Sequence, residues 1–222
     1  KVGGADCVIS QTGFTGEKGY EIYVRDAHEN AEKMWNAVLE AGEEFGLMVI
    51  APAHHRRIAA GILSWGQDLD HETSPFQVNL SYQVPRNKTA DYIGKEELEK
   101  QRAIIDEGKA PFKMKMVGLT LGGKEITDYA PDFWIVTNTG GDEVGYVTSP
   151  WWSPELETNI ALAWVPWEAS EVGTEYMVKL PDEYADSPGV AVNAKIVNVP
   201  FRESVNPNKR EVQASKGLDF AD

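Results

Sequence analysis

Two kinds of hydrophobic pattern alternate along the first part of the chain. Short apolar runs at 7–10 and 20–24, separated by a turn-rich segment, predict two β-strands. Apolar residues then recur every three or four positions through 29–45, which predicts an amphipathic helix that stops at Gly46. Pro52 fits the first turn of a second helix, which we expect to reach Ile62. The pattern at 75–80 fits either a helical turn or a strand.

The pattern changes after a third predicted helix at 95–107. Beyond Phe112 the apolar runs become short and are separated by glycine-rich or proline-containing turns. Six such runs at this spacing predict a small β-barrel or sandwich. The expected strands are 115–121, 133–137, 143–148, 160–165, 175–180 and 190–199.

These patterns together predict an α+β protein. We expect an α/β domain at 1–90, a linker helix at 91–110, a small antiparallel β-barrel at 111–203 and a polar tail at 204–222. Because the chain starts at Lys1 and enters a predicted strand almost at once, we expect it to be part of a longer protein.

The composition of the chain limits the kinds of partner that we expect it to bind. The 222 residues include 21 Lys and Arg against 35 Asp and Glu, a formal net charge of −14. Such a chain repels phosphate backbones and anionic lipid surfaces, so we expect neither nucleic acid nor a membrane as a partner. The single cysteine, Cys7, excludes an internal disulfide and a Cys-rich metal site, and it fits a cytoplasmic protein.

Two local patterns resemble known sites but lack their context. The spacing of Gly13, Gly16 and Gly19 is similar to that of a phosphate loop, yet a strand rather than a helix is predicted to follow. His54 and His55 are adjacent on a predicted helix, with no carboxylate three or four residues away. We therefore predict no metal site, with one histidine packed and the other solvated.

Four further residues receive structural interpretations. Asp68 and Asp70 resemble part of a calcium loop but lack its glycine and distal glutamate, so we interpret them as turn or helix-capping residues. Trp151 and Trp152 lie between two prolines and are predicted to form a rigid aromatic loop. Such a loop serves either packing or, as an alternative, a ligand wall.

Four segments in the same order carry a family resemblance. Residues 11–22 (QTGFTGEKGYEI) closely resemble the signature RTGYTGEDGxEI of the glycine-cleavage T-protein (aminomethyltransferase) family. Residues 57–70 (RIAAGILSWGQDLD) resemble its LRLEAGLxLYGxDID motif. The segments 145–149 and 153–154 are similar to GxVTSGxxSP, and 159–163 with 200–202 fit the family's barrel. The resemblance covers nearly the whole chain, to about residue 203.

This resemblance implies a tetrahydrofolate-dependent one-carbon transferase of which the chain is the C-terminal part. The N-terminal portion of the same enzyme, which supplies the family's catalytic aspartate, would then be a partner, together with a small-molecule donor. Glu21 matches the family's pterin-binding glutamate, and a carboxylate can accept both hydrogens of the pterin edge. Trp65 replaces a family tyrosine and is suited to pack on a folate ring, and Arg202 is suited to meet a folate carboxylate.

Departures from the family pattern favour a demethylase. The arginine of an A-R-D motif is replaced by Ala53, and the following His-His-Arg-Arg looks closer to folate-dependent demethylases that act on vanillate, syringate or dimethylsulfoniopropionate. We therefore expect methyl transfer to N5 of tetrahydrofolate, and hypothesise that one of His54, Arg56 or Arg57 faces the substrate.

Other functions stay open at this point. They are the aminomethyltransferase of glycine cleavage, the C-terminal half of a sarcosine or dimethylglycine oxidase, and a non-catalytic folate-binding fragment. The folate-binding protein of iron–sulfur maintenance is disfavoured, because its KGCxxGQE motif is absent. No catalytic residue is assigned from the sequence.

Overall fold

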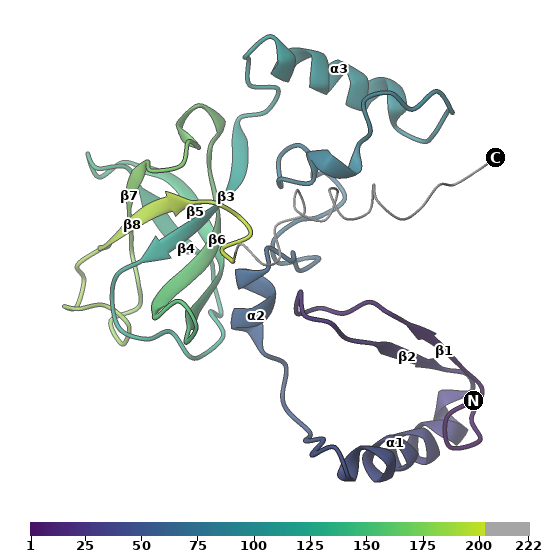
Figure 1. The fold of residues 1–222 in the computed structure, drawn as a ribbon. Helices are drawn as coiled ribbons and strands as arrows, with labels where there is room; N and C mark the ends of the chain where they lie inside the picture. Colours follow the sequence, from purple (N-terminus) through teal and green to yellow (C-terminus); the bar gives the residue numbers. More distant parts are fainter. Residues whose placement is uncertain (203–222) are drawn as a thin grey trace. The chain divides into compact units, whose positions relative to one another are not determined.

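A computed structural model describes residues 1–202 and divides the chain into two compact units, the second beginning at His55. Along the chain a β-hairpin comes first, helices follow, and a β-barrel comes last (Figure 1). The predicted tail at 204–222 lies outside the described residues.

The first unit consists of a β-hairpin and one helix. Strand β1 (Cys7–Ser10) pairs antiparallel with β2 (Glu21–Val24), so that Ser10 lies opposite Glu21. Helix α1 (Ala27–Glu43) follows, and the chain turns at Gly46, whose φ of 70° is readily adopted by glycine. The hairpin confirms that a strand, not a helix, follows the Gly13–Gly19 segment.

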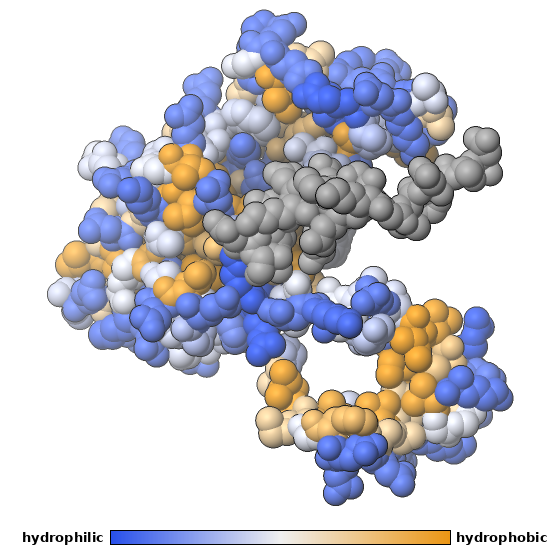
Figure 2. Space-filling view, in the orientation of Figure 1, coloured by the Kyte–Doolittle hydropathy of each residue, from blue (hydrophilic) through white to orange (hydrophobic). Residues whose placement is uncertain are grey.

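Very little of this first unit is buried. Helix α1 buries none of its residues, and Ala5 is the only buried residue in 1–54, all of which are described. Apolar side chains therefore gather on its surface, over α1 and the hairpin (Figure 2). The large exposed ones are Val8, Ile9, Phe14, Tyr20, Tyr23, Trp35, Phe45, Leu47, Met48, Val49 and Ile50.

The second unit is built around a closed six-stranded antiparallel barrel, which confirms the α+β fold class. The strands are neighbours in the order β3-β6-β5-β4-β7-β8, and β8 pairs back onto β3. Their bounds are Met114–Leu121 (β3), Trp134–Thr137 (β4), Glu143–Ser153 (β5), Thr158–Pro166 (β6), Glu175–Val178 (β7) and Val192–Val197 (β8). Helix α2 (His54–Ala59), the 3₁₀ turn η1 (Ser81–Gln83) and helix α3 (Lys95–Asp106) precede the barrel, and the 3₁₀ turn η2 (Trp167–Ala169) follows β6.

Alternation along the strands gives the barrel two packed layers. Every second residue of β3, for example Leu119, points into the barrel with Val136, Ala163 and Val178. The outer face of β3 and β6 is covered as well, because Met116 and Leu162 pack against Ile58 of α2 and Val78. This second layer joins α2 and the loop that follows it to the barrel wall.

The structure corrects several local predictions. Trp151 and Trp152 do not form a loop, because β5 runs five residues past its predicted end and includes both. Helix α2 begins at His54 rather than at Pro52 and ends at Ala59. Gly61, two residues after the helix, adopts a φ of 70°. The ambiguous 75–80 segment is a turn, closed by a hydrogen bond from the Leu80 amide to the Pro75 carbonyl.

Candidate functional site

Glu21 stands at the first position of β2, where the strand emerges from the hairpin loop. Its side chain is half-buried, and the Thr12 hydroxyl contacts one carboxylate oxygen. The same hydroxyl lies 3.0 Å from the Ser10 hydroxyl, on the strand opposite. The loop and the neighbouring strand thus orient Glu21, and a carboxylate held in this way suits a ligand that presents two adjacent N–H donors.

Trp65 lies in a tight loop after α2, in the second unit. The Gln67 and Asp68 amides both donate to the Ser64 carbonyl, and the Gly66 amide donates to the Leu69 carbonyl at 2.8 Å. Gly66 adopts a φ of 81°, which lets the chain reverse within a few residues. The backbone is thereby folded on itself while the indole of Trp65 remains 68% exposed.

A buried ion pair fastens this loop. The Arg57 guanidinium of α2 donates to Asp68 Oδ2 at 2.8 Å, and both residues are 1% exposed. The second Asp68 contact comes from the Ser64 amide, at 2.7 Å. Arg57 also donates to the Ile62 carbonyl at 3.2 Å. Such a pair tolerates burial because its polar atoms are satisfied by hydrogen bonds.

Strand β5 completes the network through two consecutive hydroxyls. Asp68 Oδ1 accepts hydrogen bonds from Thr148 at 2.6 Å and from Ser149 at 2.5 Å. Arg57 Nη2 donates to the Ser149 hydroxyl at 2.8 Å. Neighbouring residues of a regular strand point to opposite faces, but β5 carries a register shift between Val147 and Ser149. This irregularity explains how both hydroxyls reach one oxygen.

The network changes two interpretations made from the sequence. Asp68 is not a simple turn or capping residue, although the Ser64 contact is cap-like, because it is the centre of a buried polar cluster. Arg57 is buried and its guanidinium is hydrogen-bonded within the protein, so it cannot face a substrate. Of the three residues hypothesised to face the substrate, His54 and Arg56 are left. The sequence did carry a signal, since Arg57, Asp68 and the Thr148–Ser149 pair all belong to the motifs of the family resemblance.

Arg202 lies against the end of α2. It forms an ion pair with Glu155 at 3.1 Å and donates to the Arg56 carbonyl at 3.4 Å. Partial burial of the imidazole lowers the pKa of His55 below its ordinary value, and the positive charges of Arg56 and Arg202 add to this effect. His54 and His55 are both half-buried, so the prediction of one packed and one solvated histidine is wrong.

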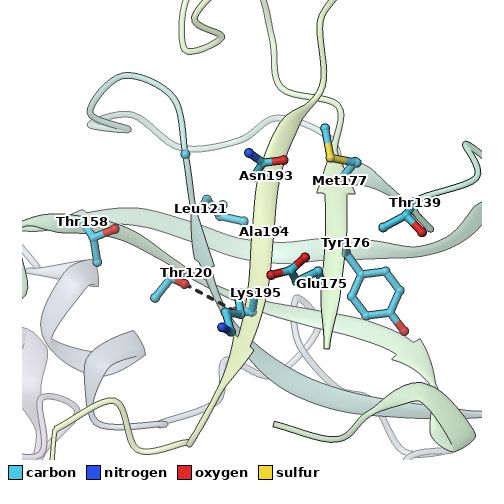
Figure 3. A pocket seen from close by; sticks show the side chains of 11 residues that line it. Thr120, Leu121, Thr139, Thr158, Glu175, Tyr176, Met177, Asn193, Ala194 and Lys195 are labelled. Carbon is cyan, nitrogen blue, oxygen red and sulfur yellow. Dashed lines mark hydrogen bonds between the residues drawn. The ribbon is translucent and has the colours of Figure 1, made fainter. Parts of the chain in front are cut away.

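A separate hollow of about 430 Å³ opens on the barrel wall beside β7 and β8 (Figure 3). Side chains of Thr120, Glu175, Met177, Asn193 and Lys195 contribute to its lining. None of the residues predicted from the sequence to bind folate belongs to it.

Among residues 1–202, no cluster of three or more His, Cys, Asp or Glu side chains could hold a metal ion. No helix in that range is long and apolar enough to cross a bilayer.

Family comparisons match most of the chain. Residues 1–88 match the GCVT N-terminal domain, and residues 115–202 match the glycine cleavage T-protein C-terminal barrel domain. The second match coincides with the barrel seen here.

Individual relatives agree with these matches. Aminomethyltransferases of Geobacillus sp. (strain WCH70) and Symbiobacterium thermophilum are each 35% identical to the chain, over 202 and 205 residues. These alignments cover 90% and 91% of the chain but 50% and 49% of the relatives. The crystal structure of the glycine cleavage system aminomethyltransferase T from Bartonella henselae has the same fold, with a TM-score of 0.66 at 24% identity, over 88% of this chain and 49% of that one. The chain therefore spans about half the length of these relatives.

Proposed function

Because the chain belongs to the glycine cleavage T-protein family, we propose that it forms part of a tetrahydrofolate-dependent one-carbon transferase of the aminomethyltransferase type. The observation that carries this proposal is the succession of both family domains along one chain. The relatives named above support the aminomethyltransferase interpretation better than the demethylase interpretation favoured by the sequence. In such an enzyme, a nitrogen of tetrahydrofolate accepts the one-carbon unit.

Glu21 is the residue we assign to the pterin. The ring N–H and the exocyclic amine of a pterin form a two-donor edge, and a carboxylate can accept from both. Glu21 is suited to this role because it is half-buried and oriented by the Thr12 hydroxyl. Its partner Thr12 can rotate away from or share the carboxylate, since a hydroxyl is an adaptable donor.

The test is a calorimetric titration with tetrahydrofolate. We expect Glu21→Gln to weaken binding by about tenfold or more, because one charge-assisted acceptor is replaced by a donor. The matched control is Glu40→Gln, an exposed position of α1 in the same unit. Equal affinities for wild type and the Glu21 variant would remove Glu21 from the site.

Trp65 and Arg202 receive secondary roles in the proposal. The exposed indole of Trp65 offers a flat apolar face to a folate ring. Arg202 is proposed to meet a folate carboxylate, but it already pairs with Glu155, so binding there requires that the ion pair open or be shared. Trp65→Ala is therefore expected to weaken folate binding more than Arg202→Gln.

A demethylase remains the second candidate because of one specific observation. Ala53 stands where the aminomethyltransferase motif has arginine, and His54 and Arg56 follow it. Assaying the full-length enzyme with glycine-derived aminomethyl donors and with methoxy-aromatic or sulfonium donors separates the two reactions. Product formation only from a methyl donor would establish the demethylase and reject the aminomethyltransferase.

We also propose a partner for the apolar surface of the first unit, namely the N-terminal portion of the same enzyme. The relatives are twice as long as the aligned segment, and the surface over α1 and the hairpin is too apolar to remain in water at little cost. The backbone edges of a two-stranded sheet also offer unpaired groups to further strands.

The coding sequence upstream of Lys1 provides the test. If it encodes the first half of an aminomethyltransferase, the longer protein is expected to bind far less of an apolar dye than residues 1–222 alone. An unrelated upstream domain, or equal dye binding by both proteins, would contradict the proposed partner.

A further inference from the structure

The loop that presents Trp65 is held by residues from three separate segments of the second unit. They are Arg57 on α2, Asp68 in the loop itself, and the Thr148–Ser149 pair on β5. We propose that Asp68 and Ser149 are positioning residues, which fix the backbone on both sides of Trp65 so that its exposed indole meets tetrahydrofolate in one orientation. This inference rests on the proposed function of Trp65.

The anchoring points lie close to Trp65 on either side. The preceding residue is fixed by the bond from the Ser64 amide to Asp68, at 2.7 Å. Two residues after Trp65, the Gln67 side-chain amide donates to the Thr148 carbonyl of β5 at 2.7 Å. The indole of Trp164 adds a third anchor, since it donates to the Asp68 carbonyl at 3.0 Å. These hydrogen bonds thus fix the position of the loop relative to the barrel wall.

An exposed ring on a fixed backbone differs from an exposed ring on a mobile loop. A mobile loop must be ordered when ligand binds, and ordering each flexible side chain costs affinity. A loop held beforehand avoids this cost, which is the general benefit of preorganisation. The indole of Trp65 is 68% exposed whereas Asp68, three residues later, is 1% exposed. The network therefore combines access to ligand with a rigid attachment.

Ser149 is the best residue through which to test the proposal. Its hydroxyl bridges the two charges, because it donates to Asp68 Oδ1 and accepts from Arg57 Nη2 at 2.8 Å. Ser149→Ala removes this bridge and leaves the direct ion pair in place. The matched control is Ser153→Ala on the same strand, since Ser153 is equally buried but its hydroxyl accepts only from the Leu156 amide among the hydrogen bonds described.

The readout is ¹⁹F NMR of the chain labelled with 5-fluorotryptophan. Trp65→Phe identifies the resonance of Trp65 among the seven tryptophans. We expect Ser149→Ala to shift or broaden this resonance and to weaken tetrahydrofolate binding about three- to tenfold, the cost of ordering one mobile side chain. Ser153→Ala should leave both unchanged. A Trp65 resonance identical in wild type and Ser149→Ala would overturn the proposal.

The experiment separates failure of this inference from failure of the proposed function. If Ser149→Ala changes the Trp65 resonance but wild type shows no response to tetrahydrofolate, the positioning of the loop stands and the folate function fails. If tetrahydrofolate shifts the wild-type resonance but Ser149→Ala has no effect on it, the folate function stands and the positioning role fails. Asp68→Asn, which retains the shape of Asp68, gives a second variant with a larger expected change.

Discussion

The two units of this chain use similar apolar patterns to opposite effect. The barrel unit places its apolar residues inside and beneath α2, where Leu119, Val136 and Leu162 are all fully buried. The first unit has an equally regular amphipathic helix, yet α1 buries nothing. Since apolar burial is the main favourable term in folding, the barrel unit must supply most of the stability of the chain. An amphipathic pattern therefore does not by itself show that the apolar face of a helix is buried.

The largest effect should come from breaking the ion pair of the barrel unit. Asp68→Ala leaves Arg57 as a buried charge without its carboxylate, which costs about 3–5 kcal/mol of unfolding free energy. Urea unfolding followed by circular dichroism measures it. Asp70→Ala, two residues away and exposed, serves as the control and should cost less than about 1 kcal/mol. Equal losses of unfolding free energy in the two variants would contradict a stabilising role of the Arg57–Asp68 pair.

The next largest effect should be a difference in unfolding free energy between matched isoleucine truncations in the two units. Ile160→Ala removes a fully buried side chain of β6 and should cost about 2–5 kcal/mol. The same change at Ile50, which is 70% exposed in the first unit, should lie within about 0.5 kcal/mol of wild type. Both are measured by urea unfolding. A large loss at Ile50 would show that residues 1–54 are packed in solution in a way that the structure does not contain.

Hydrogen exchange should reveal the same contrast residue by residue. Amides of β3 and β6 should open only with global unfolding, because both strands are paired on two sides and buried. Amides of β1 and β2 should open at a small fraction of that free energy. Mass spectrometry of the exchanging chain gives both values. Comparable protection in the hairpin and the barrel would contradict the difference between the units.

The smallest predicted effect is a pH dependence in the barrel unit. The pKa of His55 is lowered in the fold, so between this lowered value and about 6.5 the unfolded chain binds more protons than the folded one. Its contribution to stability is therefore complete above pH 6.5 and declines as the pH falls toward the folded pKa. His55→Gln should reduce the difference in unfolding free energy between pH 7.5 and 5.5. An unchanged difference would show that other groups cause it.

Local elements could be predicted from hydrophobic periodicity and turn residues, whereas the contacts within the polar cluster could not. The first strand was predicted at its observed bounds, and five of the six barrel strands were predicted to within two residues at each end, because period and turn residues are local signals. The Arg57–Asp68 pair joins residues eleven apart, and its contacts to β5 reach across more than eighty positions. No periodicity reports such contacts, so Asp68 was interpreted as a turn residue.

The extended β5 strand was underestimated for a related reason. Pro150 and Pro154 beside two tryptophans look like the boundary of a strand, since proline lacks an amide donor. The strand nevertheless continues through Trp152, whose amide donates to the Ile126 carbonyl outside the β5–β6 ladder. Tertiary pairing thus outweighed the local signal.

The register shift in β5 has a consequence for how this molecule tolerates length changes. Deleting Thr148 would restore a regular pairing of β5 with β6, with Ser149 still opposite Leu162, but it would remove the hydroxyl that donates to Asp68 Oδ1 and the carbonyl that accepts from Gln67. The extra residue of β5 thus supplies two of the hydrogen bonds that hold the Trp65 loop against the barrel wall. Shortening or lengthening the chain at this point should be far more damaging than doing so at the Asn138–Asp142 turn, where the backbone simply reverses in solvent.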